Sequence, residues 1–398
     1  SIFFDRTHTP RFESKEEIPG GVIRGCLARM ISRLAGRSEQ NRKLEEITRG
    51  TKLAALGENF SKIRITHAFP GNTCFTRPVK PPLSLVKADA LYDAALLDGP
   101  ALINGKAPDF SVDWKDHGDI NQLFGWPCLD RELRVRTAID RENLRKESEK
   151  LFAYDMIVPA GYCWLARVDL SAVDSNQREA VADQLAALFS HGLLGLGKSK
   201  VSVKTRLLPS GSVEDAHAID QIENWMGIDA LLVLTLQTPA LLLDPAEMAA
   251  KKSAAALFKN YQTAFKGLTA ALNLERFFAR QNLSGGRYQH GRFQNNATYR
   301  PWLLTEAGSL FVFSVKQYDK AVQDVKKWLK TGLPFPPAVL KGYKLGDDTA
   351  RLWEKCPFVP QNGYGEIAVN LNIHAEYCPE GEAFQPIERI ENEEVNCE

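Results

Sequence analysis

The chain has 398 residues, of which 44% are hydrophobic and 25% are charged, and its 50 Lys and Arg nearly balance its 49 Asp and Glu. This composition is typical of a folded globular protein and excludes a disordered or fibrous chain. The sequence contains no long uninterrupted apolar run, so we expect no membrane-spanning helix, and its length predicts two domains.

The seven cysteines are widely scattered and never form a C-x-x-C pair. Their spacing predicts neither a disulfide framework nor a zinc ribbon. We also recognise no signal peptide, so we expect a cytoplasmic protein with free thiols.

The near-neutral total hides a separation of charge along the chain. Residues 376–398 hold eight Glu and one Arg, a local balance of −7, which leaves +8 for residues 1–375. Residues 20–80 hold twelve Lys or Arg against four Glu, and residues 198–206 hold four Lys or Arg and no acid. A charged run is usually a solvated face, but two basic stretches beside glycine-rich turns favour a partner with a phosphate backbone.

Apolar periodicity predicts the elements of the N-terminal half. Residues 22–35 have helical spacing, and residues 62–69 alternate apolar with basic or polar side chains, as in a strand whose open face is basic. Residues from about 70 to 133 are rich in Pro and Gly and predict a long insertion, either irregular or a protruding hairpin. The remaining predictions are strands at 135–139, 162–170 and 201–208 and a helix at 176–190.

The C-terminal half repeats this order of elements. Strands are predicted at 230–236, 309–315 and 366–374, and helices at about 249–280 and up to about 330. The sequence therefore predicts an α+β fold with two ferredoxin-like (RRM-like) β-α-β-β-α-β domains. The first domain is residues 1–210 with the insertion, and its first strand would precede the chain or lie at residues 2–4. The second domain is residues 211–375, and residues 376–398 form an acidic tail.

Residues 192–199 match the G-x-x-x-x-G-K-[ST] pattern of a phosphate-binding loop. A true P-loop leaves a strand and opens a helix, because the helix N-terminus helps to hold the phosphates. Here a predicted helix precedes the motif and a β-branched, alternating segment follows it. A P-loop nucleotide hydrolase using Lys198 is therefore only a remote alternative.

Three glycine-rich turns in the sequence could bind an anion without forming a P-loop. They are residues 19–21 at a predicted helix N-terminus, residues 192–200, and residues 361–365 before the last predicted strand. Without a Cβ atom the backbone can approach a ligand closely and present its N–H groups to an anion. Each could equally be a simple tight turn, but together with the basic strand they favour RNA or another phosphodiester polymer.

Several segments also occur in a recognisable order. They are residues 18–28 (IPGGVIRGCLA), 67–70 with Arg77-Pro78 and Pro81-Pro82, 138–141 (AIDR) with 150–154 (KLFAY), Gly285-Gly286, 307–313 (AGSLFVF) and 363–365 (GYG). In this order they resemble the repeat-associated mysterious proteins (RAMPs) of type III CRISPR effector complexes, particularly the subtype III-D branch. Two features depart from the family pattern: residues 192–203 lack the closing glycines of its loop, and the first strand is missing.

The resemblance implies a cytoplasmic subunit, not a membrane protein, that grips guide RNA through glycine-rich loops and basic surfaces. It implies as partners the CRISPR guide RNA, target RNA and other type III subunits, including the large polymerase-like subunit. The two-domain layout and the Ala-Gly-Ser pattern favour the branch that caps the 5′ handle of the guide over the backbone branch. The residues predicted to contact RNA are Gly20, Gly21, Arg24, Arg29, Lys62, Arg64, Lys198 and Lys200.

The backbone branch cuts target RNA with an Asp that lies about a dozen residues before the I-P-G segment. Asp5 occupies a similar position, thirteen residues before Ile18. Its carboxylate could orient the target's 2′-hydroxyl, or bind a divalent metal ion, for in-line attack on the neighbouring phosphate, with His8 assisting proton transfer. Target-RNA endoribonuclease activity is thus an alternative, as are a surface-turn role for Asp5 and an assembly protein that never contacts RNA. We predict no other cofactor.

Overall fold

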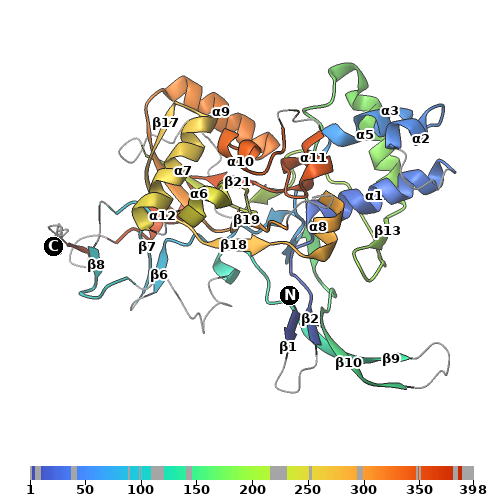
Figure 1. Cartoon of the computed structure of the whole chain (residues 1–398), viewed down its shortest axis with the longest axis horizontal. Coiled ribbons are helices and arrows are strands. Elements are labelled where there is room, and N and C mark those ends of the chain that lie inside the picture. The colour runs from blue at the N-terminus through green and yellow to red at the C-terminus, as the bar shows by residue number, and fades with distance from the viewer. Residues whose placement is uncertain are drawn as a thin grey trace.

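A computed structural model of the chain gives a mixed α+β fold, as the sequence predicted (Figure 1). Among the described helices, none combines the length and the apolar character needed to span a bilayer. The structure describes residues 2–4, 10–36, 43–87, 90–97, 99, 101–108, 121–139, 146–215, 231–250, 253–293, 299–346, 348, 351–379 and 384–387. Asp5, His8 and most of the acidic tail lie outside these residues, so their predicted roles stay predictions.

The C-terminal half is built on one antiparallel sheet with the strand order β17-β20-β16-β21. Its elements, in chain order, are β16 (Leu231–Leu236), α7 (Ala254–Leu268), β17 (Leu272–Phe278), β20 (Leu310–Val315), α9 (Tyr318–Thr331) and β21 (Ile367–Val369). The chain therefore follows a β-α-β-β-α-β path through this sheet.

Alternation along β16 gives this sheet two different faces. Leu232 and Leu234 pack with Phe265 of α7 and Val325 of α9 in the main core. Val233, between them in sequence, belongs to a separate cluster on the opposite side. The two helices lie together over the first face (Figure 1).

Part of the predicted insertion covers the second face. Ala95 is fully buried against Val233 and Val312, and the N–H of Leu83 donates to the carbonyl of Gly308 (2.9 Å). This region holds the short strands β5 (Thr76–Arg77), β6 (Leu85–Lys87), β7 (Leu91–Asp93) and β8 (Ala101–Ile103), the last paired with β22 (Phe384–Pro386). An RRM stacks bases on an open sheet face, so this covered face is not available for that kind of binding.

The hairpin that protrudes from the molecule lies later in the chain than predicted. It is formed by β9 (Arg131–Ile139) and β10 (Lys146–Ile157) (Figure 1). Near its base β10 pairs with β2 (Pro10–Glu13), which in turn pairs with β1 (Ile2–Phe4). Residues 2–4 are therefore a strand, but they belong to the sheet of this hairpin, so their role as the first strand of a ferredoxin-like domain stays a prediction.

The rest of the N-terminal half combines helices with short ladders. Its helices are α1 (Gly20–Leu34), α2 (Leu44–Thr48), α3 (Ala54–Asn59), η1 (Phe60–Lys62) and α5 (Ser175–Ser190). Its two-stranded ladders are β3 (Arg64–Ile65) with β12 (Val168–Asp169), β4 (Phe69–Gly71) with β11 (Cys163–Leu165), β13 (Leu193–Leu196) with β14 (Val201–Val203), and β15 (Glu214–Asp215) with β5. Because these ladders are separate, two ferredoxin-like domains stay a prediction.

The remaining elements decorate the C-terminal half. They are α6 (Pro245–Ala250), β18 (Gln281–Ser284), α8 (Arg287–Phe293), β19 (Trp302–Thr305), α10 (Pro337–Gly342), α11 (Leu352–Lys355), η4 (Pro360–Asn362) and α12 (Ile373–Glu376). In the N-terminal half, Cys74 and Cys163 are joined by a disulfide, which the scattered cysteines did not predict.

Five predicted elements were wrong in extent. The strands expected at 62–69 and at 162–170 are each broken into two short strands, β3 and β4 in the first case and β11 and β12 in the second. The helix expected to reach residue 280 ends at Leu268, because Leu272 and Leu274 alternate with polar residues and enter the sheet as β17. The strand expected at 201–208 ends at Val203. The strand expected at 366–374 ends at Val369, and after a turn at Asn370, whose φ is +44°, the chain forms α12.

Arg77 and Glu366 join the two halves of the chain. The two side chains, 1% and 6% exposed, form a bidentate ion pair with both N–O distances at 2.9 Å. The Arg77 guanidinium also donates to the carbonyls of His67 (3.0 Å) and Leu165 (3.3 Å) and lies over the Phe69 ring at 4.1 Å. Burial alone would raise the pKa of Glu366, but the nearby arginines, first Arg77, hold it below its usual value.

Breaking this pair should destabilise the whole fold. Glu366→Gln leaves the buried Arg77 charge with only the more distant carboxylate of Asp215 (3.7 Å), so we expect the free energy of unfolding to fall by about 3 kcal/mol. Glu354→Gln is the matched control, because it breaks the exposed Arg351–Glu354 pair (2.8 Å) and should cost about 1 kcal/mol or less. Denaturant unfolding measures both, and equal costs for the two variants would contradict this role of Arg77.

Candidate nucleic-acid interface

The segment that matches the P-loop pattern is a β-hairpin. It follows α5, and β13 pairs with β14 in the register Leu193↔Val203. Gly192, Gly195 and Gly197 have φ values of +76°, +81° and +66°, which allow the tight turns. Strand β14 therefore occupies the position at which a helix begins in a P-loop. This arrangement argues against nucleotide hydrolysis at Lys198.

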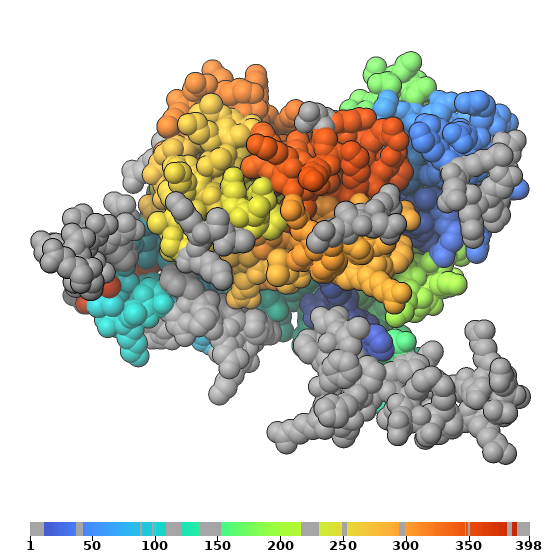
Figure 2. Space-filling view, viewed as in Figure 1, coloured from blue at the N-terminus to red at the C-terminus, as the bar shows by residue number. Residues whose placement is uncertain are grey.

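The hairpin has one face in the core and one in solvent. Leu193 and Leu196 are buried in the N-terminal core with α1 and α5, whereas Leu194 and Val201 are 48% and 46% exposed. All four of its cations are exposed, and residues 191–213 contain no acid. Figure 2 shows this yellow-green segment at the edge of the molecule. Its four cations are Lys198, Lys200, Lys204 and Arg206.

Arg29 fixes the hairpin to α1. Its guanidinium donates to the carbonyl oxygens of Leu194 (3.1 Å) and Gly195. A Cβ atom at Gly195 would collide with this guanidinium, so the glycine permits the contact. The structure thus brings Arg29 together with the predicted Lys198 and Lys200, and Arg29 positions the loop that carries them.

Lys198 also lies beside aromatic side chains that the sequence did not single out. Its Nζ atom is 5.0 Å from the centre of the Phe12 ring, and Phe12 stacks on Tyr154 at 5.3 Å. This is the distance of a cation–π interaction. Lys62 lies apart from this group and pairs with Asp174 (2.9 Å) in a partly exposed ion pair.

Arg24 and Arg64 lie in the contact between the halves rather than on the surface, so the open basic face predicted for the strand at 62–69 was wrong. Arg24 donates to Oδ1 of Asn362 (2.6 Å) and to the carbonyl of Phe60 (3.1 Å), and burial lowers its pKa to about 10. Arg64 donates to the carbonyls of Lys330 (2.6 Å) and Pro360 (3.3 Å), and burial lowers its pKa too. A phosphate would reach either guanidinium only by displacing these partners.

Gly20 and Gly21 pack against the same loop of the C-terminal half. A Cβ atom on Gly20 would lie 2.8 Å from the carbonyl oxygen of Asn362, as well as 1.9 Å from that of Ile65 in β3, and one on Gly21 would lie 3.2 Å from the Asn362 side chain. From the other side, Gly363 has a φ of +87°, and a Cβ atom there would lie 2.7 Å from the His67 ring. Two of the three glycine-rich turns therefore meet each other, and their glycines allow close packing between the halves.

His67 is part of this packed contact, in line with the structural role that lone histidines usually have. It is 1% exposed, and its ring meets the Tyr364 ring edge-on at 4.8 Å. Neither of its ring nitrogens has a hydrogen-bond partner. Burial lowers the pKa of His67 to about 4, despite the opposing effect of nearby Glu17 and Glu366, so the ring is neutral at pH 7.

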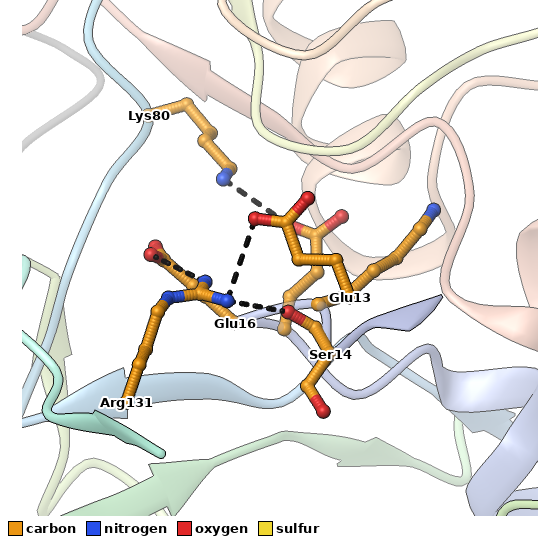
Figure 3. A pocket seen from close by; sticks show the side chains of 7 residues that line it. Glu13, Ser14, Glu16, Lys80 and Arg131 are labelled. Atoms are coloured by element: carbon orange, nitrogen blue, oxygen red, sulfur yellow. Dashed lines mark hydrogen bonds and ion pairs between the residues drawn. The ribbon is translucent and has the colours of Figure 1, made fainter. Parts of the chain in front are cut away.

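A shallow hollow of about 320 Å³ lies near the base of the β9–β10 hairpin (Figure 3). Arg131 pairs with Glu13 (3.4 Å) and Glu16 (3.3 Å), and Lys80 pairs with Glu17 (3.2 Å). These cations are already neutralised by carboxylates, so we assign the hollow a structural role in holding the hairpin. The lining residues are Glu13, Ser14, Lys15, Glu16, Glu17, Lys80 and Arg131. Within the described residues, no group of three or more His, Cys, Asp or Glu side chains is arranged to hold a metal ion.

The structure is similar to subunits of type III CRISPR complexes. One is a chain of a type III-B Cmr-beta complex bound to cognate target RNA and AMPPnP, with 13% identity, a TM-score of 0.36 and coverage of 79% of this chain and 81% of that chain. Another is a chain of the same kind of complex bound to cognate target RNA, with 11% identity, a TM-score of 0.36 and 82% of each chain covered. A third is a chain of a Csm3–Csm4 subcomplex from a type III-A interference complex, with 13% identity, a TM-score of 0.34 and 76% of this chain and 90% of that chain covered.

No protein-family model matches the sequence. No curated protein matches it significantly.

The buried His67 should make the fold sensitive to acid. An unfolded His has a pKa near 6.5, so between pH 6.5 and about 4 the unfolded chain binds a proton that the folded chain does not. The free energy of unfolding should therefore fall by about 3 kcal/mol from this group as the pH drops through this range. Denaturant unfolding of the original chain and of His67→Gln at pH 7 and pH 4.5 measures it: the variant should lose less stability on acidification, and an equal loss would contradict the assignment.

Proposed function

We propose that the chain is a guide-RNA-binding subunit of a type III CRISPR effector complex. In this role it grips the backbone or the 5′ handle of the CRISPR RNA and helps to present the guide to target RNA in antiviral defence. Its partners would be the guide, the target and other type III subunits, including the large polymerase-like subunit, in the cytoplasm. The ordered resemblance of its segments to RAMP proteins supports this proposal.

The observation that carries the proposal is the acid-free, exposed β13–β14 hairpin. Its four cations lie in the turn of the hairpin and directly after β14, beside a ladder whose apolar face is buried and which Arg29 links to α1. Among the described residues, no carboxylate pairs with these four cations. Such cations suit a phosphate backbone, because binding releases the counterions that the phosphates hold. The flanking Phe12–Tyr154 stack would provide an apolar surface beside the backbone path.

The residues predicted to contact RNA fall into two groups with different surroundings. Lys198 and Lys200 are exposed on the hairpin, and Arg29 holds it, whereas Arg24, Arg64, Gly20 and Gly21 build the contact between the halves. Phosphate contact by this second group stays a prediction. In the proposal it acts by fixing the position of α1, and therefore of the hairpin.

Removing the hairpin cations should weaken RNA binding for all guide sequences alike. With Lys198, Lys200 and Lys204 all changed to Gln, the slope of log affinity against log salt should fall by about 2, because each phosphate contact to single-stranded RNA contributes about 0.7. Fluorescence anisotropy of the full chain with a labelled CRISPR RNA at several salt concentrations measures this.

In the matched control, three exposed lysines outside the hairpin are changed to Gln. They are Lys259 and Lys266 of α7 and Lys341 of α10. It changes the net charge equally, so its salt slope should stay within about 0.5 of the original. An equal loss in both triple variants would mean that only total charge matters, and the proposal for this surface would fail.

A further inference from the structure

A second basic surface lies on the C-terminal half, between β17 and β20. Residues 279–300 contain four Arg and no Asp or Glu, although the whole chain is nearly neutral, and one of the four, Arg280, pairs with Glu306 (3.9 Å). The described part of this segment includes β18 and α8, and Figure 2 shows it in light orange across the front of the molecule. Its Gly285-Gly286 pair is one of the segments that resemble RAMP proteins.

The surface stands on a rigid base. β18 pairs with β19 in the register Ser284↔Trp302, and Trp302 and Leu304 of β19 are buried. The ladder is fixed to the rest of the half by a bridge between Ala240 and Thr305. Gly286, with a φ of +129° and open space around it, turns the chain from β18 into α8. The cations of α8 are therefore presented on a fixed support.

Helix α8 itself contributes nothing to the core. None of its seven residues is buried, and a helix of this length has little stability of its own in water. Tyr288 is 76% exposed, the highest exposure among the large apolar and aromatic residues described, and Arg292 lies one turn later on the same face. Tyr299, 51% exposed, lies against His290 with ring centres 5.5 Å apart. The surface thus combines flat aromatic rings with guanidinium groups.

This combination fits one chemical class of ligand. Single-stranded RNA offers unpaired bases that stack on exposed aromatic rings and phosphates that pair with Arg. An acidic peptide would satisfy the arginines but would leave the rings without a flat partner.

We propose that the β18–α8 surface binds single-stranded RNA, with a base stacked on Tyr288 and phosphates held by Arg287 and Arg292. This inference rests on the proposed function, since the RNA would be the guide or target of the complex. It adds a contact on the C-terminal half that is separate in sequence from the β13–β14 hairpin.

The test separates stacking from charge. With the full chain and the same labelled CRISPR RNA, Tyr288→Ala should weaken binding about 10-fold without changing the salt slope, and Tyr288→Phe should restore it, because the ring is kept. Changing both Arg287 and Arg292 to Gln should lower the salt slope by about 1.4. Tyr318→Ala, at the exposed start of α9, is the control and should bind as the original chain does.

Cross-linking gives a direct readout. RNA substituted with 4-thiouridine should cross-link to the peptide that contains Tyr288, and mass spectrometry identifies that peptide. If the hairpin triple variant weakens binding while Tyr288→Ala does not, and no cross-link forms, this inference is wrong and the proposed function stands. If neither surface affects binding, both are wrong. If Tyr288→Ala blocks assembly with another subunit but leaves RNA affinity unchanged, the surface binds protein and the inference is overturned.

Discussion

The structure depends on how a few buried charges are neutralised where the two halves meet. Arg77 is almost fully buried, and a buried guanidinium is costly unless every donor finds a partner. Glu366 supplies the bidentate carboxylate from the C-terminal half, and the carbonyls of His67 and Leu165 supply the rest from the N-terminal half. Arg24 and Arg64 donate to Asn362, Lys330 and Pro360 of the C-terminal half without a bidentate carboxylate, so three arginines link the two halves.

This arrangement decides which basic residues remain for a ligand. The arginines and glycines nearest the contact are used in packing, and the second face of the C-terminal sheet is covered by Ala95 and its neighbours. Exposed cations remain on several segments, among them the β13–β14 hairpin and the β18–α8 surface. The hairpin has its apolar face in the N-terminal core, and β18–α8 is supported by the buried side chains of β19. A guide RNA bound along the molecule would therefore contact elements from both halves.

The sequence predicted the strongly periodic elements best. Helix α1 and strands β16 and β20 occur where their apolar patterns placed them, since burial against one core fixes them locally. It failed where tertiary contacts decide: Leu272 and Leu274 enter a sheet although the preceding helix pattern continues toward them. In the candidate site too, local sequence predicted the exposed residues but not the long-range contacts. The exposed Lys198 and Lys200 follow from local charge and turns, but nothing local shows that Arg24 meets Asn362, 338 residues later in the chain. Tyr288 could have been found from its place in an arginine-rich, acid-free segment.

The central claim is that this chain holds guide RNA, and the RNA that it carries tests this most directly. The full chain would be purified with its native partners, unprotected RNA digested with nuclease, and the protected RNA sequenced. We predict short RNAs that share one repeat-derived 5′ end followed by variable spacer sequence. Purification without protected RNA, or with fragments of unrelated sequence and no common end, would contradict the account.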